Sequence, residues 1–101
     1  MTNIQRQRTL QTASTSLAGT EVLAAARDFF GRRSGIYAAF VEQEGPAYLT
    51  LRGQGGEEVV VAVFGVAPNT TVTGSSYMFD QQVALFLSSL PPAAVVAGAG
   101  A

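Results

Sequence analysis

The side chains that most often perform catalysis are missing from this chain of 101 residues. It contains no histidine, no cysteine and no lysine. Histidine is the usual general base near neutral pH, and cysteine and lysine are common nucleophiles. The serine, threonine and tyrosine hydroxyl groups therefore have no such base to activate them. We expect a protein that is not an enzyme and that uses no cofactor.

Carboxylates come in two close pairs, Glu42 with Glu44 and Glu57 with Glu58. A general acid–base pair needs two carboxyl groups that converge on one point. The first pair flanks a predicted turn, and the adjacent members of the second point to opposite faces of a strand. Together with Asp80, the first pair could offer only oxygen ligands, as Mg²⁺ or Ca²⁺ would require, and the spacing does not favour it. We expect solvated hairpin ends and no metal site.

Phosphate and nucleic-acid binding are also disfavoured. The glycine-rich stretch 53–56 lies between two predicted strands, whereas a phosphate-binding loop opens a helix, so a hairpin turn is expected. Arg27, Arg32 and Arg33 share one predicted helix, either as a solvated face or as forks for a partner's anionic group. The net charge of −1 is too small for a general attraction to nucleic acid. We expect no nucleic-acid partner.

Composition indicates one folded domain. Hydrophobic residues make up 48% of the chain and charged residues 13%, against about 25% in an average protein. Residues 9–90 are expected to form a single domain, between a flexible N-terminus at 1–8 and a tail of proline, alanine, glycine and valine at 91–101. No apolar run approaches the roughly 20 residues of a membrane span, and the polar N-terminus lacks the apolar stretch of a secretory signal. We therefore expect a cytoplasmic protein.

Periodicity predicts two helices and five strands. A helix over about 20–33 has Thr20 as its N-cap, an apolar face at helical spacing and Gly35 as its stop. A second helix follows residue 77 and ends at Pro91. Short connections bearing glycine or proline separate the later strands, as in antiparallel hairpins. The predicted strands cover 9–15, 36–42, 47–52, 57–66 and 70–77.

The order β-α-β-β-β-β-α predicts an α+β protein, with a single antiparallel five-stranded sheet and both helices on one face. This order resembles that of the TATA-box-binding-protein repeat. Residues 9–15 followed by Leu17-Ala-Gly-Thr-Glu-Val-Leu, with 71–77 before the last helix, also resemble a shortened helix-grip fold, as in START-like and polyketide-cyclase-type proteins. The second resemblance implies a carrier of an apolar small molecule. Either as such a pocket or as ordinary core, five residues would then lie between the sheet and the last helix: Phe29, Phe40, Phe79, Val83 and Phe86.

Two predicted strands are apolar on both faces. The run 59–64 reads VVVAVF, and 36–41 reads IYAAFV, with Ile36, Ala38 and Phe40 expected towards the helices. Polar neighbours could half cover the second face, or another copy of the chain could cover it. We favour a non-enzymatic module that acts as a homo-oligomeric assembly or protein-binding domain, with a dimer preferred. The expected interface residues are Tyr37, Ala39, Val41, Val60, Ala62 and Phe64.

Overall fold

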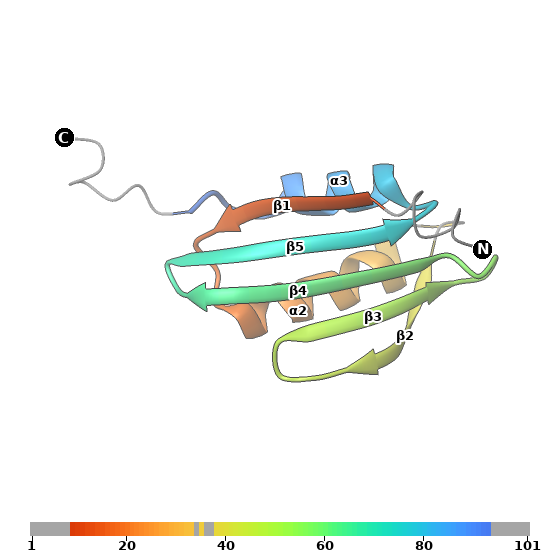
Figure 1. Ribbon diagram of the computed structural model, residues 1–101, viewed down its shortest axis with the longest axis horizontal. Helices are drawn as coiled ribbons and strands as arrows, with labels where there is room; N and C mark the ends of the chain where they lie inside the picture. The colour runs from red at the N-terminus through yellow and green to blue at the C-terminus, as the bar shows by residue number, and fades with distance from the viewer. Residues whose placement is uncertain (1–8, 34, 36–37, 94–101) are drawn as a thin grey trace.

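Five antiparallel strands form one sheet, and two helices lie on one of its faces (Figure 1). The computed structural model describes residues 9–33, 35 and 38–93. The strand order is β1-β5-β4-β3-β2, so β2 to β5 form a meander and β1 pairs with the last strand. This confirms the predicted α+β class. The elements are β1 (Thr9–Thr15), α2 (Gly19–Asp28), η1 (Phe29–Arg33), β2 (Ala39–Glu44), β3 (Tyr48–Gly53), β4 (Glu58–Val66), β5 (Asn69–Tyr77) and α3 (Asp80–Ser89).

The first helix covers the predicted span, but its N-cap and the form of its last turn differ from the prediction. Ala18 and not Thr20 is the N-cap, because the Glu21 carboxylate accepts a hydrogen bond from the Ala18 N–H at 2.9 Å. Such a reach-back satisfies one of the polar groups that a helix start leaves open. After Asp28 the chain widens into the π-helical turn η1. Gly35 has a φ of 58°, the left-handed conformation expected of a glycine that stops a helix.

The core lies between the sheet and the helices. Phe86 of α3 contacts Phe29 and Phe30 of η1, with ring centroids 5.5 Å apart in both pairs. Alternate strand residues face these rings, as the twofold period of a strand requires. The fully buried members of this core include Val22, Phe30, Leu51, Val59, Val61, Val72, Val83 and Phe86. Neither helix of the described residues has the length and apolar character needed to cross a bilayer.

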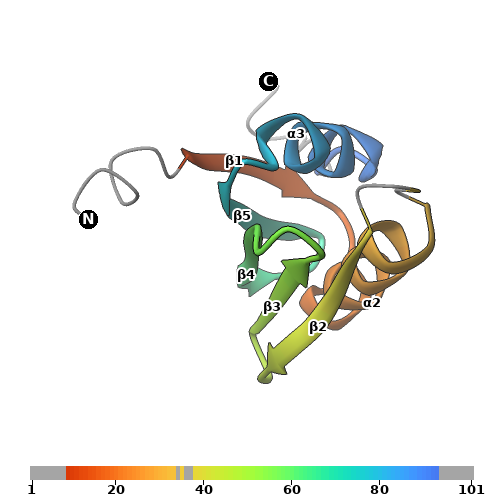
Figure 2. The same cartoon turned by 90° about the vertical axis from the view of Figure 1, so that its right-hand side faces the viewer.

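The sheet curls around the helices, and side-chain contacts attach both of its edge strands to neighbouring segments. Figure 2 shows β2 bent towards α2, and Arg27 of α2 forms an ion pair with Glu44 of β2. At the opposite edge of the sheet, the Thr15 hydroxyl donates to the Pro91 carbonyl oxygen at 2.6 Å, and Pro92 makes a β-bridge with Thr15. The segment that follows α3 is therefore tied to the end of β1.

Helix α3 approaches β5 closely because Gly74 has no side chain. A Cβ atom at this position would lie 2.6 Å from Cγ1 of Val83. Val83 is fully buried, so it has little room to move.

Gly74→Ala should therefore destabilise the protein by about 1–3 kcal/mol, the usual cost of overpacking a core. Urea denaturation followed by circular dichroism measures this change in the free energy of unfolding. Gly31→Ala is the matched control, because its new Cβ would meet only the Ala39 carbonyl oxygen at 3.9 Å. Equal stability of Gly74→Ala and the wild type would contradict the close approach.

Candidate functional site: the open face of the sheet

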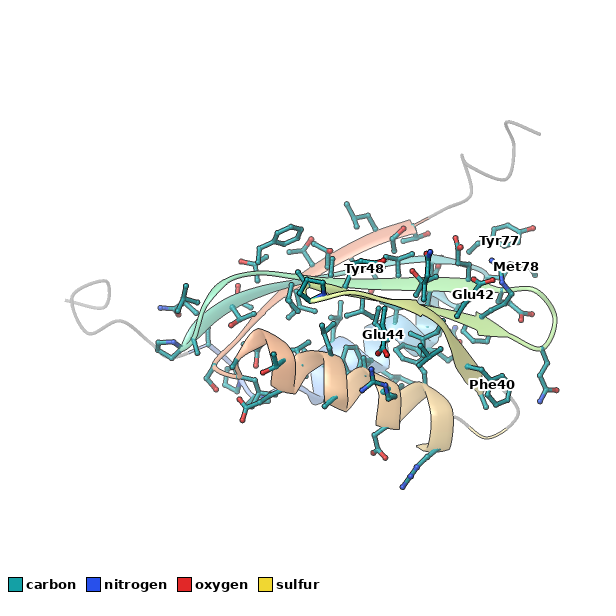
Figure 3. All side chains as sticks on the ribbon, turned by 90° about the horizontal axis from the view of Figure 1, so that it is seen from below. Phe40, Glu42, Glu44, Tyr48, Tyr77 and Met78 are labelled. Atoms are coloured by element: carbon teal, nitrogen blue, oxygen red, sulfur yellow. The ribbon has the colours of Figure 1, made fainter. Side chains whose placement is uncertain are left out.

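The face of the sheet opposite the helices, here called the open face, is covered by no element of the described chain (Figure 2). Every strand contributes to it, because side chains alternate between the two faces. Tyr48 lies on this side of the ribbon, away from α2 (Figure 3). The apolar and aromatic members of the open face are Leu10, Phe40, Tyr48, Val60, Ala62, Phe64, Val66 and Tyr77.

The centre of the open face is uncharged. Ala62 of β4 is flanked by Tyr48 of β3 and by Thr73 of β5, and Phe64 lies beside Thr71. Ala62 is partly buried by these neighbours, whereas Phe64 remains 57% exposed. Towards β1 the surface consists mainly of hydroxyl groups, because Thr12 pairs with Thr73 and Ser14 pairs with Thr71. The result is a mixed surface of aromatic, aliphatic and hydroxyl groups with no formal charge.

The charges of the open face are gathered at one end and neutralise one another. Arg52 donates from Nε and Nη2 to the two carboxylate oxygens of Glu42, each at 3.0 Å. Its Nη2 also lies 3.3 Å from Glu58, and its Nη1 donates to the Gly56 carbonyl oxygen. The hydrogen bond and the charge of Glu42 raise the pKa of Arg52, and the charge of Glu58 adds to this. This cluster therefore offers no free guanidinium fork to an anionic ligand.

Three of the expected interface residues, Val60, Ala62 and Phe64, lie on the open face as the alternation along β4 predicts. The prediction for β2 is wrong by one position. Ala39 is 1% exposed and faces the helices, and Val41 points to the same side at the sheet edge. Tyr37 lies outside the described residues.

Which residues of β2 face the helices is decided by contacts with other elements and not by the apolar pattern of the strand itself. Ala39 pairs with Gly53, whose side of the sheet is the inner one, and η1 passes over it. The small Ala39 fits there, and Gly31 of η1 approaches its carbonyl oxygen. Phe40 consequently falls on the open face opposite Arg52, where it is 57% exposed.

The five residues of the expected apolar pocket do not share one space. Phe40 is on the other face of the sheet, so its placement beside the last helix is wrong. Phe79, Val83 and Phe86 are buried in the core, and Phe29 packs against it. Contact between the rings of Phe29, Phe30 and Phe86 fills the space between η1 and α3. The geometry is that of packed core.

The carboxylates diverge, as expected for solvated hairpin ends. Glu42 binds Arg52 on the open face, whereas Glu44 binds Arg27 on the helix side. Glu57 accepts the Gly55 N–H within the 53–56 turn. Asp80 accepts hydroxyl hydrogen bonds from Thr9 and Ser76, both at 2.8 Å. Among the described residues, no three acidic side chains are grouped to hold a metal ion.

Comparison of this chain with protein-family models, with curated proteins and with solved structures finds no match. The resemblance to START-like proteins and to the TATA-box-binding-protein repeat therefore stays a prediction.

Replacement of Arg52 by glutamine should lower the free energy of unfolding only slightly, because Arg52, Glu42 and Glu58 are all partly exposed to water, which screens their attraction. The loss should shrink further in 1 M salt, where the screening length falls to about 3 Å. Urea titrations at low and high salt measure both effects. Arg32→Gln serves as control, because the Arg32 side chain is 85% exposed and its ion pair with Asp28 is long, at 3.9 Å. A loss that is independent of salt would show that Arg52 acts through packing and not through charge.

Proposed function

We propose that this chain is a non-enzymatic assembly module that associates with copies of itself through the open face of its sheet. The observation that carries the proposal is the uncovered, uncharged centre of that face. On this uncharged part of the face, Phe64 is 57% exposed, and Tyr48, opposite Ala62 on the next strand, is 36% exposed. Exposed aromatic rings on a surface depleted of charge are typical of the centre of a protein interface.

The chemistry of the open face suits a second copy of the same face. Two sheets can pack face to face about 10 Å apart, with their side chains interdigitating. In a two-fold interface each patch meets itself, so any like charge near the axis would be placed opposite its own copy. The open face avoids this repulsion, because its charges lie at the end held by Arg52 and are already paired.

Phe64→Glu should disrupt this association. The substitution places an unpaired carboxylate on the uncharged part of the open face, where desolvation of a charge is costly. Native mass spectrometry and sedimentation velocity should find the wild type at a multiple of its 10.5 kDa mass and the variant at a lower multiple. Ala24→Glu is the matched control, because Ala24 lies on the exposed side of α2. It should leave the assembly unchanged.

Two results would overturn the proposal. If Phe64→Glu keeps the wild-type mass, the open face is not the interface. If the wild type is a monomer that carries a few hundred daltons of extra mass, the alternative of an apolar small-molecule carrier replaces it. A pocket of about 300–1,000 Å³ holds a ligand of that size.

A further inference from the structure

The two edges of the sheet differ in how they are protected. An edge strand presents unpaired peptide groups, and proteins block such edges with charges and bulges. The β2 edge has both, since its register shifts between Val41 and Gln43 and it carries Glu42 and Glu44. The β1 edge has neither, because its sequence TLQTAST is uncharged and it pairs with β5 in one continuous register. The β1 edge is therefore the one suited to strand addition.

The hydrogen-bond pattern shows which peptide groups face outwards from β1. Gly53 N–H donates to Glu57 O, and Val63 N–H donates to Ala47 O. Odd-numbered residues of β4 therefore bond to β3, and bonding alternates along an antiparallel ladder. Even-numbered residues of β4 consequently bond to odd-numbered residues of β5, which leaves the even-numbered ones of β5 for β1. In the β1–β5 register, these even-numbered residues bond to Thr9, Gln11, Ala13 and Thr15. The N–H and C=O groups of Leu10 and Thr12 thus point away from the sheet.

A second feature adjoins this edge. Phe86 turns one side of α3 towards Phe29 and Phe30, and Asp80 accepts hydrogen bonds from Thr9 and Gln11 of β1. The flank of α3 away from η1 is thus on the side of the β1 edge. It holds a shallow, largely apolar hollow lined by Gln81, Ala84, Leu85 and Ser88. Leu85 is 58% exposed there.

We propose that the β1 edge, with the adjoining flank of α3, binds the same surface of a second copy of this chain. An uncharged strand can lie antiparallel to its own copy without placing like charges together. Pro92 already covers the Thr15 end, so the open part of the edge is Thr9–Ala13. A two-fold axis near Gln11 pairs Leu10 with Thr12 of the second copy, and each such pair exchanges two hydrogen bonds. The two sheets become continuous, and the two Leu85 side chains move towards the same axis.

The test uses Phe64→Glu as background, because this substitution removes the open-face association proposed above. The Phe64→Glu protein should then be a dimer by native mass spectrometry and sedimentation velocity. Adding Thr12→Pro should make it a monomer, or raise the dimer dissociation constant at least about tenfold, since two of the pairing donors are lost from each dimer. Proline at this position leaves the β1–β5 ladder intact, because the Thr12 N–H faces outwards.

Thr12→Val is the matched control. It keeps the N–H group and suits a strand, so the Phe64→Glu/Thr12→Val protein should stay a dimer. If circular dichroism shows that Thr12→Pro unfolds the chain, Leu85→Arg in the same background takes its place, with Gln82→Arg as its control. Leu85→Arg should weaken the dimer, because two like charges meet at the axis.

The outcomes separate this proposal from the preceding one. A monomeric Phe64→Glu protein overturns the edge interface and leaves the open-face assembly standing. A different result is that Phe64→Glu leaves the mass of the wild-type dimer unchanged, while addition of Thr12→Pro makes the protein a monomer. This result supports the edge interface and overturns the open-face assembly. A Phe64→Glu dimer that survives a folded Thr12→Pro variant, or Leu85→Arg where that variant unfolds, overturns the edge interface.

Discussion

The contact of Phe86 with Phe29 and Phe30 is the interaction on which the rest of the structure depends. It joins the two helices side by side over one face of the sheet, with ring centroids 5.5 Å apart. Because both helices pack on this face, no element of the described chain covers the opposite face. The same packing brings α3 down onto Gly74, where only glycine leaves room for Val83. The internal core and the uncovered surface are therefore consequences of one arrangement.

Much of the fold could be predicted from local pattern. The strand 9–15 agrees with β1 residue for residue, and the hairpins follow from short glycine and proline connections. The face that each residue of β2 presents could not be predicted, because residues 36–41 are apolar at every position and alternation carries no information there. The contact of Ala39 with the inner side beneath η1 decides it, and that contact is tertiary. The bulge after Val41 then brings Glu42 to Arg52.

Only part of the candidate site could be predicted from the sequence. Along β4, strict alternation places Val60, Ala62 and Phe64 together, and the structure adds Tyr48 from β3 and the hydroxyl groups of β1 and β5. The sequence does not reveal the importance of the β1 edge, because lack of charge in a strand has meaning only once that strand is known to be at an edge. Its place beside β5 joins residues more than 50 positions apart in the chain.

The distribution of charge explains why association should close on itself and not continue as a fibre. In the sequence, β1 and β5 carry no charged residue and α3 carries only Asp80, whose carboxylate is bound by Thr9 and Ser76. Glu42, Glu44 and Arg52 instead lie at or beside β2. Joining the β1 edge of one copy to the β2 edge of the next would be head-to-tail, and such contacts generate open filaments. The β2 bulge and its glutamates oppose that pairing. Strand β1 carries no such feature, so it can pair with the β1 strand of a second copy. This pair has a two-fold axis, so the β1 edges of both copies are covered at once.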